Sequence, residues 1–323
     1  MKTFLLVFFL FSIQLVCSQN YKTIDSLVNT YPAKFKSIES FADRIRTDFK
    51  TDLERTRAVY YWLANNITYD YKSLRKKKKI KKIRAKSKRD YELKLYQYNQ
   101  RVAEKTLRKK SAMCEGYAQL LNYTLSELDI ISVVVPGYAK QFANEIGRKR
   151  SNSNHAWNAV KIDQKWYLMD VTWSTGNSIY NDNFFNFSDT YFMINPEKLI
   201  LSHFPDDSQW QLLEKPVSRV DYFNFPAVYE AYHKSELKLE DRTVGYIITK
   251  TDSMINLYFT KIDTKKNYYY SFDGISKSDK IKFIELDGLY KVSIPYSFKR
   301  RRNLAISDGQ MVLMKFKIKL LKD

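Results

Sequence analysis

The sequence predicts an α+β fold, in which a helix-bearing core packs on an antiparallel sheet and a smaller β-rich domain follows. Three observations support this prediction. Apolar residues recur at helical spacing in residues 52–67 and 111–128. β-Branched and aromatic residues form strand-like runs in 131–135 and 155–173. After residue 215, short alternating runs are separated by turn signals, which is typical of an antiparallel β domain.

Residues 1–18 have the features of an export signal. They combine a basic start, an apolar run over residues 4–13, and the small residues Val16 and Ser18 before a cleavage point. The apolar run is too short to span a bilayer. A lipid anchor on Cys17 is the weaker alternative, because Val16 is larger than the residue preferred directly before a lipidated cysteine. We therefore expect a soluble mature protein that is secreted or periplasmic.

Once this leader is removed, Cys114 is the one cysteine left, so no internal disulfide can form. An unpaired thiol is unusual in an exported protein, where cysteines tend to be paired or absent. About 300 mature residues suffice for one large domain or two ordinary ones, each with its own core. With 25 tyrosines and 20 phenylalanines, packing alone can hold the fold.

Most of the net charge of +20 lies in one segment. Between Lys72 and Lys110 there are 18 basic and 3 acidic residues, so the rest of the chain carries only +5. We expect a solvated insertion with one surface helix after residue 90. The alternative is a patch that binds an anionic polymer or an anionic membrane surface. Nucleic acid fits less well, because the tyrosines at 91, 96 and 98 follow the densest charge instead of lying within it.

Two helices and three strands are predicted around this insertion. Thr51 and Glu54 fit a capping box for a helix over residues 52–65. Ser111 can cap a second helix that reaches Leu128. Strands are expected at 131–135, ended by Pro136-Gly137, and at 155–162 and 165–173, with loops over 140–154 and 176–187. The β-rich domain is expected to be sandwich-like and antiparallel, built from the runs 243–260, 266–273, 280–295 and 311–320.

Cys114 falls in the first turn of the second helix, where the helix dipole favours a thiolate. A thiol nucleophile needs a histidine as general base, and the histidine needs an orienting acid. The chain has three histidines: His155, His203 and His233. We interpret His203 as mainly structural, because it precedes Phe-Pro in a turn, and His233 as a surface residue.

Hairpin geometry selects the histidine and the acid. If Asp163-Gln164 is a two-residue turn, Trp157 faces Asp170 and His155 faces Thr172. His155 and Asp170 are then diagonal neighbours on one sheet face, roughly 7–8 Å apart at the backbone and closer at their tips. A one-residue slip in register would place them on opposite faces. Taken singly, each of these residues is as well explained by packing, but their occurrence in this order favours catalysis.

Several motifs in this region resemble one family. They are Ala112-Met-Cys-Glu-Gly-Tyr-Ala118, Val135-Pro-Gly-Tyr-Ala-Lys140, Asn154-His-Ala-Trp-Asn-Ala-Val160 and Trp166-Tyr-Leu-Met-Asp-Val-Thr-Trp173. Together they resemble the transglutaminase-like superfamily of papain-related cysteine enzymes, and most closely its transglutaminase/protease-like, kyphoscoliosis-peptidase-like branch. The resemblance covers about residues 50–215, and two features depart from it: the basic segment before the cysteine, and the β-rich tail.

The resemblance implies a papain/transglutaminase-like core with Cys114 as nucleophile, His155 as general base and Asp170 as its orienting partner. Trp157, Trp173 and Tyr117 are candidates for the wall of the cleft. The expected domains are 1–18 as signal peptide, 19–215 as transglutaminase-like domain with a basic insertion at about 72–110, and 216–323 as the β-rich domain.

The function expected from these features is cysteine-dependent acyl transfer on peptide or protein amides, with hydrolysis favoured over cross-linking. No cofactor or metal is expected, because the sequence contains no EF-hand pattern, zinc-ligand spacing or phosphate-binding glycine loop. The alternative is a non-catalytic binding protein that reuses the fold and contacts an anionic partner through residues 72–110. A structural assembly factor acting through the β-rich domain is a third hypothesis.

Overall fold

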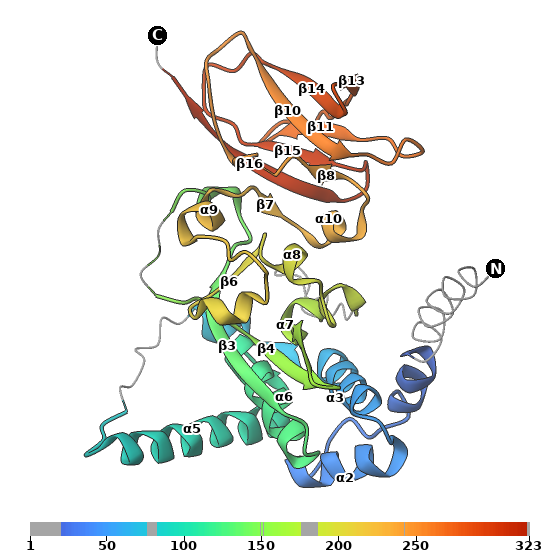
Figure 1. Cartoon of the computed structure of the whole chain (residues 1–323), viewed down its shortest axis with the longest axis vertical. Helices are drawn as coiled ribbons and strands as arrows, with labels where there is room; N and C mark the ends of the chain where they lie inside the picture. Colours follow the sequence, from blue (N-terminus) through green and yellow to red (C-terminus); the bar gives the residue numbers. More distant parts are fainter. Residues whose placement is uncertain are drawn as a thin grey trace, which may run out of the picture. The chain divides into compact units, whose positions relative to one another are not determined.

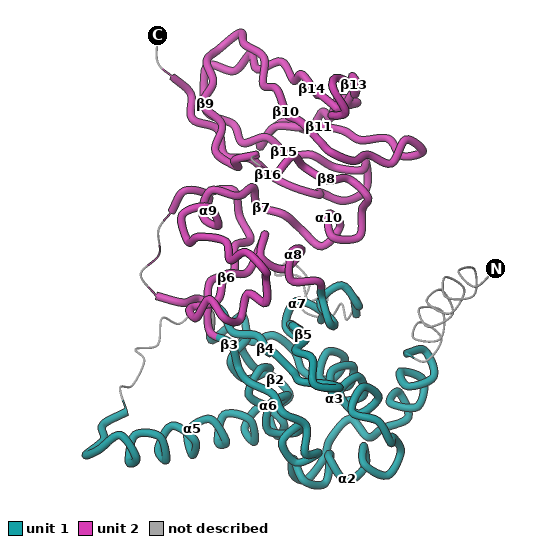
Figure 2. The backbone as a smooth tube through the Cα atoms, in the orientation of Figure 1, with its two compact units in different colours: residues 1–135, 155–194 teal, residues 136–154, 195–323 magenta. Residues whose placement is uncertain are grey.

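The computed structural model describes residues 21–75, 83–148, 150, 152–175, 187–241 and 243–321. The chain divides into two compact units, residues 1–135 with 155–194, and residues 136–154 with 195–323 (Figure 2). The expected boundary at 215/216 follows sequence motifs and stays a prediction, as does the leader at 1–18, which lies outside the described residues. The loop expected at 176–187 also lies outside them, apart from its last residue.

The first unit combines helices with the strands that carry the predicted site (Figure 1). Residues 21–28 are helical and precede the named elements. The named elements are α2 (Ile38–Asp48), α3 (Asp52–Asn66), β1 (Thr68–Tyr69), α4 (Tyr71–Arg75), α5 (Lys88–Lys109), β2 (Ser111–Ala112), α6 (Cys114–Glu127), the first half of β3 (Ser132–Ala139), β4 (His155–Ile162), β5 (Lys165–Met169), α7 (Val171–Ser174) and the 3₁₀ turn η2 (Asp189–Tyr191).

Helix α3 confirms the capping box predicted from the sequence. The Thr51 side chain accepts a hydrogen bond from the Glu54 backbone, and the Glu54 carboxylate accepts one from the Thr51 backbone in return. The predicted apolar stripe, which includes Val59, Trp62 and Leu63, is fully buried. The stripe belongs to the same core cluster as buried residues of α2 and α6, so it packs in the core that supports the helix carrying the cysteine.

Helix α6 begins at Cys114 and not after a Ser111 cap, so that part of the prediction is wrong. The backbone of Ser111 pairs in parallel with Thr68, which forms the short β1–β2 ladder. Met113 is therefore the N-cap residue. Ser111 belongs to a strand and does not form the cap that the local sequence indicates. Cys114 still lies in the first turn of α6, as predicted.

Strands β4 and β5 form the hairpin that the sequence predicts, in the predicted register. Asn158 pairs with Met169 and Ile162 pairs with Lys165. The two turn residues of Asp163-Gln164 both have positive φ, 48° and 63°, as the tight hairpin turn requires although neither is glycine. Strand β5 is shorter than the predicted 165–173, because the chain enters α7 after Met169. The expected pairing of His155 with Thr172 is therefore wrong.

Strand β3 continues through Pro136-Gly137, where the sequence predicted its end. The Pro136 carbonyl accepts a hydrogen bond from the Asp206 N–H (2.9 Å). Proline lacks an N–H but keeps its carbonyl, so the strand can pair at this position. The first half of β3 lies beside β4 in the first unit. Its second half pairs with β6 (His203–Pro205) in the second unit.

The second unit continues with short helices and then the strands of the β-rich region (Figure 1). Its further elements are η1 (Ala143–Glu145), α8 (Pro196–Leu199), η3 (Ser208–Gln211), α9 (Arg219–Asn224), β7 (Ala227–Val228), α10 (Glu230–Lys234), β8 (Lys238–Leu239), β9 (Tyr246–Thr249), β10 (Ser253–Lys261), β11 (Tyr269–Phe272), β12 (Asp279–Lys280), β13 (Ile284–Leu286), β14 (Leu289–Tyr296), β15 (Leu304–Ser307) and β16 (Val312–Leu320).

These strands form two sheets that share one apolar core. One sheet has the order β13-β14-β10-β8, and the other has the order β12-β11-β15-β16-β7, with β9 pairing in parallel to β16. Buried side chains from both sheets, such as Phe259 and Phe316, belong to the same cluster. The fold is α+β with a sheet-rich C-terminal region, as predicted, although the β9–β16 pair departs from the expected antiparallel arrangement. In the described part of the chain, no helix combines the length and apolar character that a membrane span needs.

Candidate active site

Close packing fixes the position of Cys114 at the start of α6. The cysteine is 8% exposed. A side chain at Gly116 would bring its Cβ to 2.5 Å from Thr106 Oγ1 and from Ala112 Cβ, so glycine alone lets α5 and β2 approach the first turn this closely. On another side of the helix, the Asn158 side chain donates to the Ala118 carbonyl (3.0 Å) and joins β4 to α6.

His155 and Asp170 form the hydrogen bond that the hairpin geometry predicts. His155 Nε2 lies 2.6 Å from Asp170 Oδ2, and Asp170 is 1% exposed. The carboxylate is held from several directions, because its Oδ1 accepts from the Trp173 N–H (3.2 Å) and caps α7. The Asp170 N–H donates to the Tyr191 carbonyl (3.0 Å).

Tyr60 is a supporting residue that the sequence analysis missed. Its hydroxyl donates to the Asp170 carbonyl (2.9 Å) and lies 2.6 Å from Ser174 Oγ, so it holds both ends of α7. Tyr60 lies in α3, 110 residues before Asp170. No local pattern links residues so far apart, so the sequence offered no signal for this contact.

The charge state of His155 depends on its neighbours more than on its burial. Burial lowers the pKa of the imidazole, but the charges of Asp170 and Cys114 and their hydrogen bonds to the ring raise it to about 10. Asp170 bonds to Nε2, and Cys114 is the second group that raises the pKa of this ring. The predicted contact between His155 and Asp170 is present, and the joining of Cys114 to this pair stays a prediction.

Two of the three predicted wall residues are buried, and the third is half-buried. The Trp157 ring stacks on the His155 ring with centroids 6.1 Å apart, and Trp157 is 1% exposed. Trp173 is half-buried and lies 5.9 Å from the same ring. Tyr117 is 1% exposed, and its hydroxyl donates to the Ile67 carbonyl (2.5 Å). Trp173 is therefore the member of this set that a bound molecule could reach most directly.

The other two histidines lie in the second unit. His203 is buried, its Nδ1 is 2.8 Å from Ser202 Oγ, and its backbone pairs with Ala139, which suits a structural role. The interpretation of His233 as a surface residue is wrong, because it is only 4% exposed within α10. Burial, followed by the charges of His203 and Lys198, lowers its pKa to about 3.

In the first unit, His155 bonds to Asp170, and Cys114 is among the groups that raise the pKa of its imidazole. A thiol next to a charged imidazole, which is itself held by a carboxylate, is suited to nucleophilic attack on a carbonyl carbon.

Comparison with known proteins identifies the family to which this part of the chain is similar. Residues 39–171 match the family model of the transglutaminase-like superfamily, and they include Cys114, His155 and Asp170. Residues 39–171 are a transglutaminase-like domain. The resemblance seen in the sequence motifs is thereby confirmed.

Three similar proteins cover parts of the chain. Kyphoscoliosis peptidase from Homo sapiens is 31% identical over 223 residues, which are 68% of this chain and 30% of that protein. Hillarin from Drosophila melanogaster is 25% identical over 153 residues, which are 43% of this chain and 19% of hillarin. A crystal structure of a TGase has 19% identity and a TM-score of 0.29, covering 53% of this chain and 37% of that one. The match to the human peptidase thus spans less than a third of its length.

Proposed function

We propose that this protein is a cysteine-dependent acyl-transfer enzyme that hydrolyses peptide or protein amides. The observation that carries the proposal is the imidazole of His155, which bonds to Asp170 through Nε2 and whose pKa is raised by Asp170 and by Cys114. The transglutaminase-like family supports cysteine-protease-like chemistry on protein substrates, and the human relative is named a peptidase.

In the acylation step, the Cys114 thiolate attacks the carbonyl carbon of the amide and a C–S bond forms. The backbone N–H of Cys114 is a candidate donor to the oxyanion, because the first N–H groups of a helix have no partner within the helix. Protonated His155 then gives its proton to the leaving nitrogen, and the C–N bond breaks. Asp170 keeps the ring oriented and stabilises its positive charge.

The thioester is resolved by water in our proposal. His155, now neutral, takes a proton from water, the hydroxide attacks the thioester carbon, and Cys114 leaves as the thiolate. An amine in place of water would give cross-linking by the same steps. We favour hydrolysis, because it needs no second binding site for an amine.

The test uses the mature chain, in which Cys114 is the only thiol. Peptide substrates and amine donors are offered to the wild type, to Cys114→Ala and to protein treated with iodoacetamide. We expect turnover of peptides that the substitution and the alkylation both abolish. Turnover that survives Cys114→Ala would refute the mechanism, and incorporation of the amine without release of free acid would change hydrolysis to cross-linking.

We further propose that the chain is exported and that cleavage precedes Gln19. A charged start, a short apolar run and small residues before the cleavage point support this proposal. N-terminal sequencing of protein recovered outside the cytoplasm should begin at Gln19. A protein that keeps residues 1–18 after export would contradict the cleavage.

The second candidate function is binding of an anionic partner without catalysis. Its support is the exposed basic surface of α5, where Arg101, Lys105, Arg108 and Lys109 all face solvent. A heparin column is a suitable polyanion probe. Retention that falls steeply with salt, together with alkylation of Cys114 no faster than that of a model thiol, would favour this function over the enzyme.

A further inference from the structure

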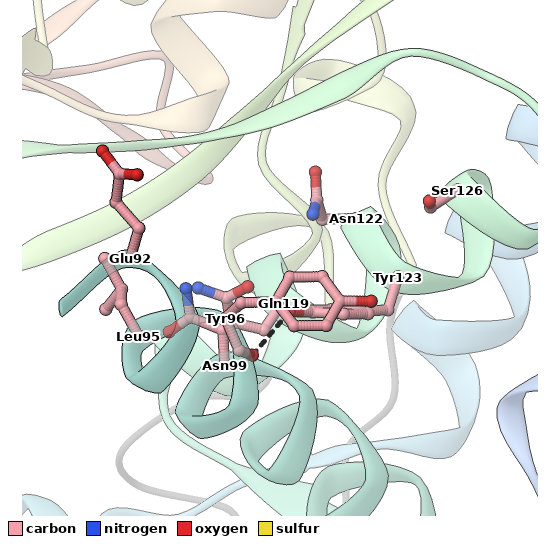
Figure 3. A pocket seen from close by; sticks show the side chains of 8 residues that line it. All are labelled: Glu92, Leu95, Tyr96, Asn99, Gln119, Asn122, Tyr123 and Ser126. Carbon is pink, nitrogen blue, oxygen red and sulfur yellow. Dashed lines mark hydrogen bonds between the residues drawn. The ribbon is translucent and has the colours of Figure 1, made fainter. Parts of the chain in front are cut away.

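Helices α5 and α6 line an open surface pocket that the proposed chemistry does not use. Its volume is about 300 Å³, and it opens between the exposed half of α5 and the middle of α6 (Figure 3). Side chains of Glu92, Tyr96 and Asn99 line it from α5, and those of Gln119, Asn122 and Tyr123 line it from α6. Both helices belong to the first unit, so the pocket lies within one compact body.

Two side-chain amides of α6, Gln119 and Asn122, line the pocket. The Asn122 Oδ1 accepts a hydrogen bond from Ser132 Oγ (2.9 Å). Because a primary amide carries two donors and an acceptor, a ligand with both donors and acceptors suits these side chains.

Two tyrosine rings provide an apolar surface beside these amides. The rings of Tyr96 and Tyr123 lie 5.5 Å apart and are tilted by 56°. The Tyr123 hydroxyl donates to the Tyr96 carbonyl (2.8 Å), which holds its ring in place. An aromatic face next to polar groups suits a ligand that has an apolar face and a polar edge.

The charge of the lining argues against an anionic ligand. Among the described residues that line the pocket, none is lysine or arginine, although α5 belongs to the most basic segment of the chain. Glu92 is acidic, and its carboxylate lies 4.0 Å from Lys88 Nζ. A phosphate or sulfate would meet this carboxylate without a lining cation, whereas a hydroxyl could donate to it.

The geometry points to a binding site for a neutral saccharide, with a pyranose ring on the tyrosines and its hydroxyl groups on the amides and Glu92. A pyranose joins a C–H face to a rim of hydroxyls, each of which both donates and accepts. A pocket of about 300 Å³ is at the lower end of small-ligand sites, which suits one sugar ring. This site is independent of Cys114 and of the proposed hydrolysis.

The experiment is saturation-transfer difference NMR on the full mature chain. The probes are the methyl glycosides of glucose, galactose, mannose and N-acetylglucosamine, and N-acetyl-triglycine amide serves as a peptide probe. We expect transfer to at least one glycoside, strongest at the protons of one ring face. Gln119→Leu and Asn99→Leu should each reduce the transfer to the level seen without protein, because the apolar side chain fills the same space without hydrogen bonds.

The matched control is Gln97→Leu, which makes the same change on the exposed face of α5 outside the pocket. It should keep full transfer, and thermal melts should show that all variants are folded. If Gln119→Leu does not fold, Glu92→Gln at the rim tests the same site with a nearly isosteric change. Absence of transfer from every glycoside, transfer unaffected by the pocket substitutions, or transfer only from the peptide probe would overturn the inference.

Discussion

Two buried histidines in this protein have opposite electrostatic behaviour. His155 in the first unit has a side chain that is 7% exposed, and His233 in the second unit is 4% exposed. The pKa of His155 is raised to about 10, whereas that of His233 is lowered to about 3. Burial lowers the pKa in both cases. The difference comes from the neighbours, because a carboxylate and a thiol raise the pKa of His155, whereas another histidine and a lysine lower that of His233.

The same difference gives the two histidines opposite effects on stability. His155 binds its proton more tightly in the folded state, so its contribution is complete below about pH 6.5 and is lost as the pH rises through about 10. His233 binds its proton less tightly in the folded state than in the unfolded one. Its contribution to the free energy of unfolding is complete above about pH 6.5 and falls as the pH drops toward about 3.

The largest expected effect comes from removing the partner of His155. In Asp170→Asn the carboxylate charge is lost, so the pKa of His155 should fall and the imidazole should no longer be held in its orientation. We expect kcat/KM for peptide hydrolysis to fall roughly 10³- to 10⁴-fold. The alkaline limb of the pH–rate profile should also move to lower pH.

Asp163→Asn is the matched control, since it makes the same change in the turn of the same hairpin. Its kcat/KM should stay close to that of the wild type. Equal losses in the two variants would show that the hairpin, and not the His155–Asp170 bond, is the sensitive element.

A smaller effect is expected in the second unit. His233→Phe removes a buried group that must stay neutral in the folded protein. Between pH 6.5 and pH 4 the wild type should lose on the order of 3 kcal/mol more stability than the variant. Urea unfolding at the two pH values measures this difference, and parallel losses would mean that His233 is not the group that resists protonation.

The smallest effect concerns the turn that sets the register of the hairpin. Gln164 has φ of 63°, which costs a non-glycine residue about 1 kcal/mol. Gln164→Gly should therefore raise the free energy of unfolding by about 0.5–1 kcal/mol and leave turnover unchanged. Lys165→Gly, which places the same residue in the strand, should lower stability instead. A destabilised Gln164→Gly would mean that the glutamine side chain has a contact of its own.

The candidate site was predictable because its main contacts are local. The capping box of α3 depends on residues three apart, and the Cys114 position depends on the helical stripe that follows it. Counting outward from the turn at Asp163-Gln164 gave the register as far as Met169, and the cap that Asp170 forms on α7 completes its placement beside His155.

Three of the missed features involve partners that are distant in sequence. Ser111 pairs with Thr68 across the basic segment. The Tyr60 hydroxyl reaches Asp170 from a helix 110 residues earlier, and α10 is packed so that His233 is buried. No periodicity or spacing in the sequence indicates which distant residues will lie next to each other in the fold.

The sequence by itself determined the fold class, the transglutaminase-like motifs and the register that brings an imidazole to a carboxylate. These depend on short-range periodicity and turn chemistry, which local residues encode. Only the tertiary structure decided which buried histidine carries a raised pKa, which hydroxyl holds Asp170, and where α5 and α6 leave a pocket lined by amides. Burial and charge are properties of the assembled surroundings, and a chain acquires them only when distant segments pack together.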